Sequence, residues 1–318
     1  MSRAFIFPGQ GSQFVGMGKD LAASFTEAKE VFEEVDDALS QKLSRLMFEG
    51  PEADLNLTEN TQPALMAHSM AVAKILRKQG GFQFENICSF MAGHSLGEYS
   101  ALTCSGAFEL AQTARLLKIR GKAMQRAVPV GVGAMAAILG LDLPEVLEVA
   151  KKATADSTKE MVCQAANDNS TGQIVVSGHA AAVQLAIDYA AEAGAKKAVL
   201  LPVSAPFHCS LMAPAAQEMA YALADSVIRP PFVPVVSNVT AKAVAEPSDI
   251  RRLLVDQITG MVRWRESVQW MKEQGVTEMV ELGAGKVLSG LIRRIDKDIA
   301  CESVGTPEGI EALIGKLK

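Results

Sequence analysis

The feature that most constrains the fold is the five-residue segment Gly93-His94-Ser95-Leu96-Gly97, which separates two different sequence patterns. An apolar, strand-like run at 89–92 precedes it, and a helix-like pattern follows it. The G-x-S-x-G spacing is typical of a nucleophile elbow, a tight strand-to-helix turn that lifts a serine hydroxyl above the edge of a sheet. A serine that only caps a helix needs no flanking glycines. The segment therefore predicts an α/β fold in which Ser95 is a nucleophile.

The rest of the chain supports this fold class because strand and helix patterns alternate along it. A first strand is predicted at 4–7, and later strands are predicted at 233–237 and 278–282. Two helical stretches separated by Gly260 lie between the later strands, and a final helix is predicted to open at Lys286. Such alternation favours a mostly parallel sheet with helices on both faces.

The middle of the chain has an order of its own. Strands are predicted at 134–139, 162–166, 174–177 and 198–203, with one helix after the first strand and another after the third. This order of strands and helices is typical of a ferredoxin-like unit. Because the patterns of the larger body resume afterwards, we interpret this unit as an insertion. The predicted bounds are 130–202 for the inserted subdomain, and 1–129 with 203–318 for a discontinuous catalytic body.

Charge and composition exclude several classes of protein. Lys and Arg number 31 and Asp and Glu 36, so the net charge of −5 is the opposite of what a nucleic-acid-binding protein needs. No apolar run reaches membrane-spanning length, and the first residues contain too few apolar side chains to form a signal peptide. The five cysteines are scattered without a C-x-x-C pair, which argues against a zinc site and a disulfide framework. We expect a cytoplasmic, monomeric protein with no nucleic-acid or membrane partner.

A serine nucleophile needs a base within hydrogen-bond reach, and the chain has four histidines to supply it. His208 follows a predicted strand directly, and catalytic groups of α/β sheets gather at such carboxyl ends. His94 is the neighbour of Ser95, and adjacent side chains on a sharp turn diverge. His68 and His179 lie in helix-like contexts. His208 is the leading candidate, and the other three histidines remain alternatives.

The oxyanion formed by serine attack needs two N–H donors, normally one from the residue after the serine and one from an early glycine-rich loop. Leu96 and Gln10 occupy these two places. The loop Gly9-Gln10-Gly11 lacks the third glycine of a dinucleotide fingerprint, and the segment 283–287 lacks the residues of a phosphate-binding loop. Neither NAD nor ATP binding is predicted, and no metal or other cofactor is expected.

Arg120 is the residue that bears on the choice of substrate. It lies in a helix predicted at 109–127, at the edge of an apolar stripe that contains Leu117. An arginine in that place needs a partner, which is either a substrate carboxylate held by two parallel hydrogen bonds or an Asp or Glu of the protein itself. A separate basic face of the same helix is either a solvated surface or a docking site for an acidic partner, and it consists of Arg115, Lys118, Lys122 and Arg126.

Several segments together carry a resemblance that spans nearly the whole chain. The motifs are FPGQGSQ at 7–13, TQPA at 61–64, AGHSLGEYSA at 92–101, Arg120-Gly121, GAM at 133–135, the Asn167/Asn169 turn with Gly172-Gln173, Phe207-His208, and ELG at 281–283. Many motifs in the right order are far more specific than any one of them. In this pattern the chain resembles the malonyl-CoA:acyl carrier protein transacylases of bacterial fatty acid synthesis, which are related to the acyltransferase domains of polyketide synthases.

The resemblance implies a role for each leading candidate. It makes Ser95 the acylated nucleophile, His208 its base, and Arg120 the partner of the malonyl carboxylate. It also implies that Gln10 supplies one N–H of the oxyanion hole beside that of Leu96.

The resemblance further implies how the histidine is held and which acyl groups fit. A main-chain carbonyl near Gln257, rather than an aspartate, orients the base, and Asn167 belongs to the substrate site. Phe207 stands where some transacylases have serine, and Phe-His is similar to the malonyl-selecting type of the polyketide acyltransferases. The ring is expected to crowd an α-methyl branch, so methylmalonyl should be disfavoured. Thr171 stands where the family often has proline.

The expected function and fold follow from the same resemblance. The chain should transfer a malonyl group from malonyl-CoA to the phosphopantetheine thiol of acyl carrier protein through a malonyl-Ser95 intermediate. The family's fold is an α/β-hydrolase-like body with a ferredoxin-like insert, in agreement with the order predicted above. Two alternatives remain: a serine thioesterase or esterase that uses water as the acceptor, and a catalytically silent protein that docks the carrier.

Overall fold

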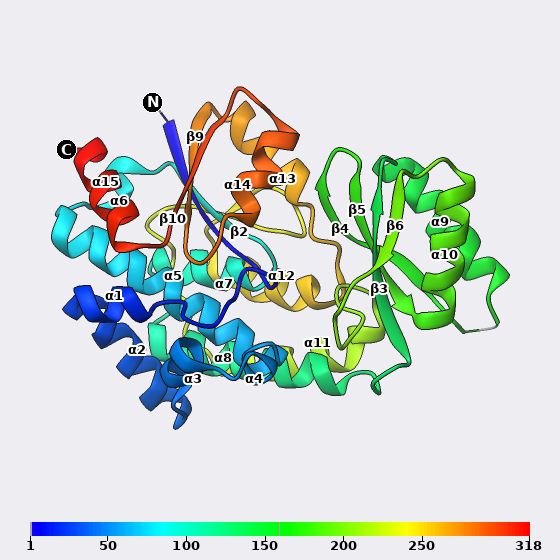
Figure 1. Cartoon of the computed structure of the whole chain (residues 1–318), viewed down its shortest axis with the longest axis horizontal. Coiled ribbons are helices and arrows are strands. Elements are labelled where there is room, and N and C mark those ends of the chain that lie inside the picture. Colours follow the sequence, from blue (N-terminus) through cyan, green and yellow to red (C-terminus); the bar gives the residue numbers. More distant parts are fainter. Residues whose placement is uncertain (1, 159) are drawn as a thin grey trace.

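A six-stranded sheet forms the centre of the larger unit (Figure 1). Its strands are β1 Ser2–Phe7, β2 Phe90–Gly93, β7 Val235–Val236, β8 Ala243–Val244, β9 Val276–Leu282 and β10 Ala300–Val304. The computed structural model describes residues 2–158 and 160–318. The strand order is β10-β9-β1-β2-β7-β8, and all neighbours run parallel except β7 and β8. The predicted α/β fold with a parallel-sheet body is confirmed.

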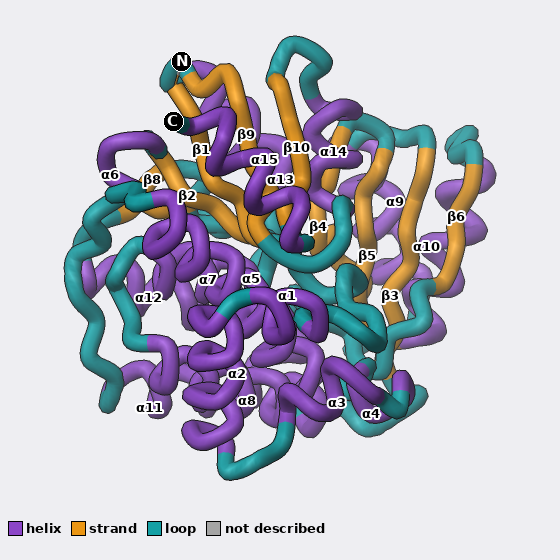
Figure 2. The backbone as a smooth tube through the Cα atoms, turned by 60° about the vertical axis from the view of Figure 1, so that its left-hand side comes forward, coloured by secondary structure: helices purple, strands orange, loops and turns teal. Residues whose placement is uncertain are grey.

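Helices cover both faces of this sheet, and the larger helical layer is visible in Figure 2. The larger layer contains α1 Lys19–Ser24, α2 Thr26–Leu39, α3 Leu43–Glu49, α4 Glu52–Leu55, α5 Thr58–Gly80, α6 Phe84–Ile87, α7 Leu96–Cys104, α8 Leu110–Arg126, α11 Ala213–Ala224, α12 Pro247–Thr259 and α15 Pro307–Leu317, with the 3₁₀ turn η1 Ser210–Met212 before α11. The opposite layer contains α13 Trp264–Glu273 and α14 Val287–Ile295.

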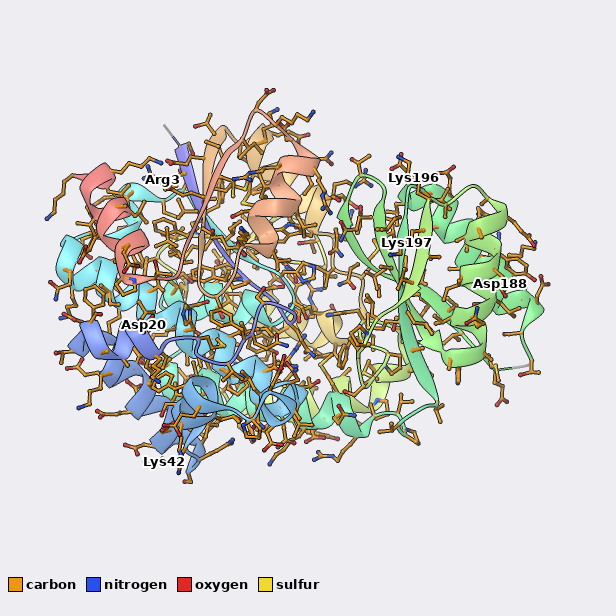
Figure 3. The ribbon with its side chains drawn as sticks, in the orientation of Figure 1. Arg3, Asp20, Lys42, Asp188, Lys196 and Lys197 are labelled. Carbon is orange, nitrogen blue, oxygen red and sulfur yellow. The ribbon has the colours of Figure 1, made fainter. Side chains whose placement is uncertain are left out.

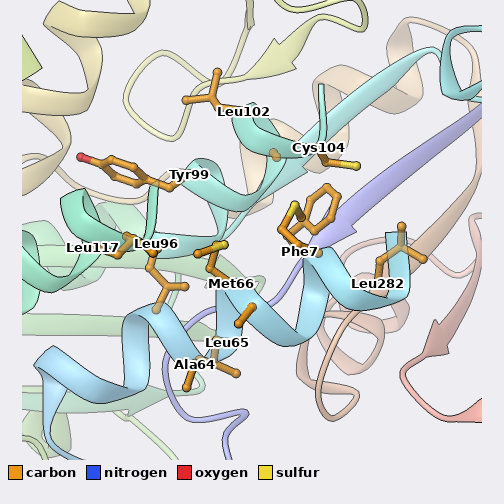
Figure 4. Packing of buried hydrophobic residues seen from close by; sticks show 14 of the residues in the cluster. Phe7, Ala64, Leu65, Met66, Leu96, Tyr99, Leu102, Cys104, Leu117 and Leu282 are labelled. Carbon is orange, nitrogen blue, oxygen red and sulfur yellow. The ribbon is translucent and has the colours of Figure 1, made fainter. Parts of the chain in front are cut away.

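The two layers follow from the alternation of side chains along the central strand β1. Phe5 and Phe7 join the large apolar cluster formed with the larger helical layer, whereas Ala4 and Ile6 join the cluster formed with α13 and α14. All four side chains are fully buried, as expected for a central parallel strand with helices on both faces. Figure 4 shows the packing around Phe7, into which α5, α7 and α8 all contribute side chains.

A glycine brings α8 close to α5 and thereby sets the depth of Arg120. A Cβ atom on Gly121 would lie 2.5 Å from Cα of Glu59, so only glycine allows this approach of the two helices. Arg120 is the preceding residue, and it is 1% exposed. The close packing of α5 and α8 therefore holds a charged side chain inside the larger unit.

The smaller unit is a four-stranded antiparallel sheet in the order β4-β5-β3-β6. It has an apolar cluster of its own, which includes Ile138, Val146, Ile174 and Val183. A capping box formed by Asp142 and Glu145 begins its first helix. Its elements are β3 Gly133–Leu139, α9 Leu143–Asp156, β4 Cys163–Ser170, β5 Gln173–His179, α10 Ala180–Glu192 and β6 Lys197–Leu200.

Strand β4 joins the smaller unit to the larger one. Asp168 on β4 is fully buried and accepts two hydrogen bonds from Nε and one from Nη2 of Arg265 on α13, at 2.9–3.0 Å. The main chain continues this contact, because Asn167 forms a parallel bridge with Val262. The side chain of Arg294 on α14 also donates to Gln173 of the smaller unit at 2.5 Å. These contacts fix the end of β4 against the larger unit.

Charged side chains project from the outer surfaces of both units (Figure 3). Lys196, Lys197 and Asp188 lie on the smaller unit, and Asp20 and Lys42 lie on the larger one. Within residues 2–158 and 160–318, no helix is both long enough and apolar enough to cross a membrane.

The structure corrects the sequence prediction at several strands: β8 was not predicted, and β4 extends beyond the predicted 162–166 to Ser170. The helix predicted to open at Lys286 is not the last element, because β10 and α15 follow α14. The strand predicted at 233–237 shortens to Val235–Val236, since Pro234 has no N–H to donate to a sheet. The strand predicted at 198–203 ends at Leu200 before Pro202, and it is an exposed edge strand with a weak apolar pattern.

Candidate active site

Ser95 lies on a strained turn between β2 and α7. Its φ of 54° and ψ of −110° fall in a region that residues with a side chain rarely adopt, and such strain persists only where the surroundings enforce it. The side chain of Asn238 provides part of this enforcement. Its Oδ1 accepts from Ser95 N at 2.7 Å, and its Nδ2 donates to Gly93 O at 2.7 Å. The turn has the strand-turn-helix form that the G-x-S-x-G spacing predicts.

The two glycines of this turn are required by close backbone contacts. A Cβ on Gly93 would lie 1.9 Å from the carbonyl carbon of Gly97, and a Cβ on Gly97 would lie 2.3 Å from Phe7 O. Neither contact is with a flexible side chain, so a larger residue would displace the backbone.

We expect Gly93→Ala to lower the free energy of unfolding by about 3 kcal/mol or more, because the added methyl group overpacks the turn. Gly290→Ala is the matched control, since a Cβ on this glycine of α14 meets nothing within 4 Å. The control should be neutral or stabilising by about 0.5–1 kcal/mol, as for alanine in a helix. Urea unfolding of both variants measures the difference. Equal stability of the two would contradict the close packing at the turn.

His208 is the histidine that contacts Ser95. Its Nε2 lies 2.8 Å from Ser95 Oγ, and its Nδ1 lies 2.9 Å from the main-chain O of Gln257. A carbonyl only accepts, so Nδ1 carries the proton and Nε2 is left free to accept from the serine. His208 itself has a φ of 57°, a second strained residue in the site.

The other three histidines do not contact the nucleophile in the described parts of the chain. His94 Nε2 bonds instead to Asn169 Oδ1 at 2.8 Å. His68 is buried in α5, and His179 accepts from the main-chain N–H of Val162 at 3.0 Å. The divergence of His94 and Ser95 on the turn agrees with the sequence interpretation.

Burial lowers the pKa of His208 to about 3, the Arg120 charge lowers it further in the same direction, and the hydrogen bond with Gln257 opposes the shift. The imidazole is therefore neutral at physiological pH. A neutral imidazole is the form that can take a proton from Ser95.

This low pKa leads to an expected pH profile. We expect the rate of Ser95 acylation by a neutral ester, p-nitrophenyl acetate, to stay nearly constant from pH 8 to pH 5. If the histidine had an ordinary pKa near 6.5, the acylation rate would fall roughly 30-fold by pH 5. The burst of nitrophenol in stopped flow measures the rate, and a tenfold fall for each pH unit below 6.5 would contradict the assignment.

Circular dichroism must show that the protein is folded at each pH. With a folded pKa of about 3 and an unfolded pKa near 6.5, the unfolded state binds more protons within that window. This histidine therefore lowers the free energy of unfolding as the pH falls from about 6.5 toward 3.

Arg120 is a buried cation directed at the nucleophile. Its Nη1 donates to Gln62 Oε1 at 2.8 Å, and its Nη2 donates to Gln257 Oε1 at 2.9 Å and to Ser95 Oγ at 3.1 Å. No carboxylate lies within salt-bridge distance of it in the described residues, so the alternative of a direct internal ion pair is not observed. The guanidinium also lies 5.7 Å from the centre of the Tyr99 ring. A charged group that is bonded only to neutral partners can take an anionic ligand.

Of the two expected oxyanion-hole donors, one belongs to the turn itself and the other to a loop that packs against it. Leu96 is the first residue of α7, and the loop that contains Gln10 packs against the turn, since a Cβ on Gly9 would lie 2.7 Å from His94 O. Neither the N–H of Gln10 nor that of Leu96 donates a hydrogen bond within the described parts of the chain. First-turn N–H groups of a helix have no intrahelical acceptor and are available to a developing negative charge.

Comparison with known proteins identifies the family. A model of the acyl transferase domain matches residues 4–307. The chain is 45% identical to the malonyl CoA-acyl carrier protein transacylase of Bacillus subtilis over 315 residues, which cover 99% of this chain and 97% of that protein. It is also 45% identical to the protein of the same name from Escherichia coli over 311 residues, which cover 98% of each chain. The chain belongs to the malonyl CoA-acyl carrier protein transacylase family.

Solved structures of family members are similar over the whole chain. The acyl-carrier-protein-S-malonyltransferase of Bartonella henselae has a TM-score of 0.96 and 54% identity, and the match covers 100% of this chain and 99% of that one. A malonyl-transacylase in complex with a type II polyketide acyl-carrier protein has a TM-score of 0.95 and 41% identity, and covers 99% of this chain and 100% of that one.

In this member of the transacylase family, two predicted substrate residues are buried near the site. Phe207 precedes the histidine and is 8% exposed within the larger apolar cluster. Asn167 is 6% exposed, and its side chain forms no hydrogen bond with the described residues. Asn169, two residues further along β4, is the one that reaches His94. The roles of Phe207 and Asn167 toward a substrate stay predictions.

Four residues of this transacylase site were not predicted from the sequence as parts of it. They are Gln62, Glu98, Asn169 and Asn238. The first three lie within motifs that carry the family resemblance, which is the signal that could have drawn attention to them. Asn238 lies far along the chain from Ser95 and follows the two-residue strand β7, so no local pattern marks it. In the described residues no group of three or more His, Cys, Asp or Glu side chains could hold a metal ion.

Proposed function

We propose that this protein transfers a malonyl group from malonyl-CoA to the phosphopantetheine thiol of acyl carrier protein, through a malonyl ester on Ser95, in fatty acid biosynthesis. The observation that carries the proposal is the buried Arg120, which lies 3.1 Å from Ser95 Oγ and has no carboxylate partner in the described residues. An acyl group with a distal carboxylate would supply that partner. The names of the transacylases from Bacillus subtilis and Escherichia coli support the same donor and acceptor.

The first half-reaction forms the acyl-enzyme. His208 Nε2 takes the proton of Ser95 Oγ as the oxygen attacks the thioester carbonyl carbon. The N–H groups of Gln10 and Leu96 hold the resulting oxyanion. Collapse of the tetrahedral intermediate breaks the C–S bond, and the proton on His208 passes to the departing CoA sulfur. Malonyl-Ser95 remains, with its carboxylate on Arg120.

The second half-reaction repeats these steps with the carrier in place of CoA. The phosphopantetheine thiol loses its proton to His208, and the sulfur attacks the ester carbon of malonyl-Ser95. Collapse breaks the ester C–O bond, and Ser95 Oγ recovers the proton from His208. The product is malonyl-carrier thioester, and the enzyme returns to its starting protonation state.

The partner of His208 bears on the hydrolase alternative. A serine thioesterase or esterase is expected to orient its histidine with an Asp or Glu, whereas here Nδ1 faces the main-chain O of Gln257 at 2.9 Å. A carbonyl stabilises the imidazolium less than a carboxylate does. The main-chain carbonyl in this place therefore departs from the arrangement expected of the hydrolase.

The test of the proposal is transfer from malonyl-, methylmalonyl- and acetyl-CoA to carrier protein, followed by mass spectrometry of the carrier. We expect malonyl to be transferred fastest. Rapid release of CoA without any carrier, with free malonate as the product, would support the thioesterase instead. Binding of the carrier without acyl exchange would support a silent docking protein.

Phe207 leads to a prediction about acyl branching. We expect Phe207→Ser to raise kcat/KM for methylmalonyl-CoA relative to malonyl-CoA about tenfold, because one methyl-sized contact in a pocket is worth roughly 1–3 kcal/mol. The half-exposed Phe232, which packs against Gly106, serves as the control position for the same substitution. An unchanged ratio in Phe207→Ser would remove this ring from substrate selection.

We further propose that the larger unit, 1–129 with 203–318, is α/β-hydrolase-like, and that 130–202 is an inserted ferredoxin-like subdomain. The antiparallel order β4-β5-β3-β6, with α9 and α10 joined to it in one apolar cluster, supports the second assignment. A cytoplasmic location stays a prediction.

The predicted docking face on α8 is partly neutralised by acidic neighbours. Lys118 pairs with Glu59 at 3.1 Å, and Arg126 pairs with Glu218 at 2.8 Å. Arg115 and Lys122, the other two basic residues of this face, are exposed and form no ion pair with the described residues. Docking of the acidic carrier on this face stays a proposal that rests mainly on these last two.

A further inference from the structure

Glu98 is a buried carboxylate that the mechanism above does not use. It lies in the first turn of α7 and is 1% exposed. No Lys, Arg or His of the described residues forms a salt bridge with it. Its Oε2 accepts from Asn238 N at 3.0 Å and from Gln257 Nε2 at 2.7 Å. Burying a carboxylate without a direct ion pair is costly, so these hydrogen-bond partners indicate where its effect is exerted.

Both partners of Glu98 hold the nucleophile. Asn238 accepts from Ser95 N, as described above, and Gln257 Nε2 also donates to Ser95 O at 3.0 Å. Gln257 in addition supplies the main-chain carbonyl for His208. One carboxylate is therefore hydrogen-bonded to the two residues that between them contact the serine and its base.

The side-chain amide of Gln257 connects Glu98 to Arg120. Its Nε2 points to the carboxylate, and its Oε1 accepts from Arg120 Nη2 at 2.9 Å. A carboxylate only accepts and a guanidinium only donates, so the amide has a single orientation that satisfies both. Turned by half a rotation, it would place its NH₂ against the guanidinium and its oxygen against the carboxylate. Burial raises the pKa of Glu98 to about 7, and its hydrogen bonds and the Arg120 charge oppose this rise.

We infer that Glu98 is a positioning residue for acyl-group selection: its charge-assisted hydrogen bond anchors the Gln257 amide, which in turn holds the Arg120 guanidinium toward Ser95. The inference rests on the proposed function, since it concerns how the malonyl carboxylate is received. A correctly placed guanidinium is needed to bind acyl groups that carry a carboxylate. It is not needed for acetyl, which has none. Loss of Glu98 should therefore reduce malonyl transfer selectively.

Glu98→Gln is the first test because glutamine has nearly the same shape but no charge, and the N–H of Asn238 still selects its oxygen. The Gln257 amide keeps its orientation, because Ser95 O and Arg120 Nη2 also require it, but its bond to residue 98 is no longer assisted by a charge and holds the amide less firmly. We expect the ratio of kcat/KM for malonyl-CoA to that for acetyl-CoA to fall roughly five- to tenfold. The matched control is Glu281→Gln, at a fully buried carboxylate of β9 that accepts from Leu288 and Ser289. This control should lose stability and keep the wild-type ratio.

Gln257→Met supplies a second test if Glu98→Gln does not fold. Methionine removes the side-chain amide and leaves the main-chain carbonyl that His208 uses, so the same selective fall in the ratio is expected. A variant of either kind that slows malonyl and acetyl transfer equally, or that keeps the wild-type ratio, overturns the inference. A wild-type enzyme without any preference for malonyl overturns the proposed function and this inference with it, so the two failures are distinguishable.

Discussion

Replacing Ser95 with alanine is expected to lower malonyl transfer on the order of 10⁴- to 10⁶-fold, the range seen when a serine enzyme loses its nucleophile. The reason is that Oγ is the atom that carries the acyl group, and it lies 2.8 Å from the base and 3.1 Å from Arg120. The residual rate should come from binding alone. Steady-state transfer to carrier protein measures kcat for the variant.

The matched control for this substitution is Ser100→Ala on α7, the helix that follows the turn. Ser100 is fully buried, and its Oγ has no hydrogen-bond partner in the structure, so its removal should cost little stability and no activity. His208→Ala should lose nearly as much activity as Ser95→Ala, and the double variant little more, because the two residues act as a unit. A Ser95→Ala variant that keeps more than a tenth of the wild-type rate would contradict the mechanism.

Arg120→Ala is expected to lower kcat/KM for malonyl-CoA by about 30-fold to several thousand-fold, the equivalent of roughly 2–5 kcal/mol for one partner of a buried charge pair. Acetyl transfer should fall much less, because acetyl has no carboxylate that Arg120 could bind. Arg120→Lys should restore only part of the rate, because an ammonium cannot reproduce the fork that now spans Gln62 and Gln257. Transfer assays with both donors measure the ratio.

Arg115→Ala is the control for Arg120→Ala, because Arg115 is an exposed arginine of the same helix without an ion pair in the described residues. It should keep the wild-type ratio of malonyl to acetyl transfer. Equal losses of both activities in Arg120→Ala would mean that the arginine supports the fold or the serine in general, and would remove the observation on which the proposed donor rests.

The parts of the fold that could be predicted are those with strong local patterns. The strands β1 and β2 were predictable because each contains a short continuous apolar run that is largely buried, and β9 because apolar residues dominate it despite Glu278 and Glu281. Strand β10, with the sequence Ala-Cys-Glu-Ser-Val, lies at the edge of the sheet and is partly exposed, so its pattern is weak. The helix after it begins at a Thr306 cap and a proline that were not recognised as a start.

The residues of the candidate site also differ in how far the sequence could predict them. Ser95 could be predicted from the spacing of its glycines, which the close contacts of Gly93 and Gly97 require. For His208 the sequence left three alternatives open, because the distance from a base to its nucleophile depends on how distant strands assemble. Asn238 and the link from Glu98 to Gln257 could not be predicted, since these contacts join residues more than 100 positions apart.

The most direct test of the central claim is mass spectrometry of the acyl-enzyme. The protein is incubated with malonyl-CoA in the absence of carrier, quenched in acid, and digested, and the peptide that contains Ser95 is weighed. We predict a malonyl group on Ser95, which disappears from that peptide and appears on the phosphopantetheine of the carrier when carrier protein is added before the quench. A Ser95 peptide that never carries malonyl, while transfer to the carrier proceeds, would contradict the account.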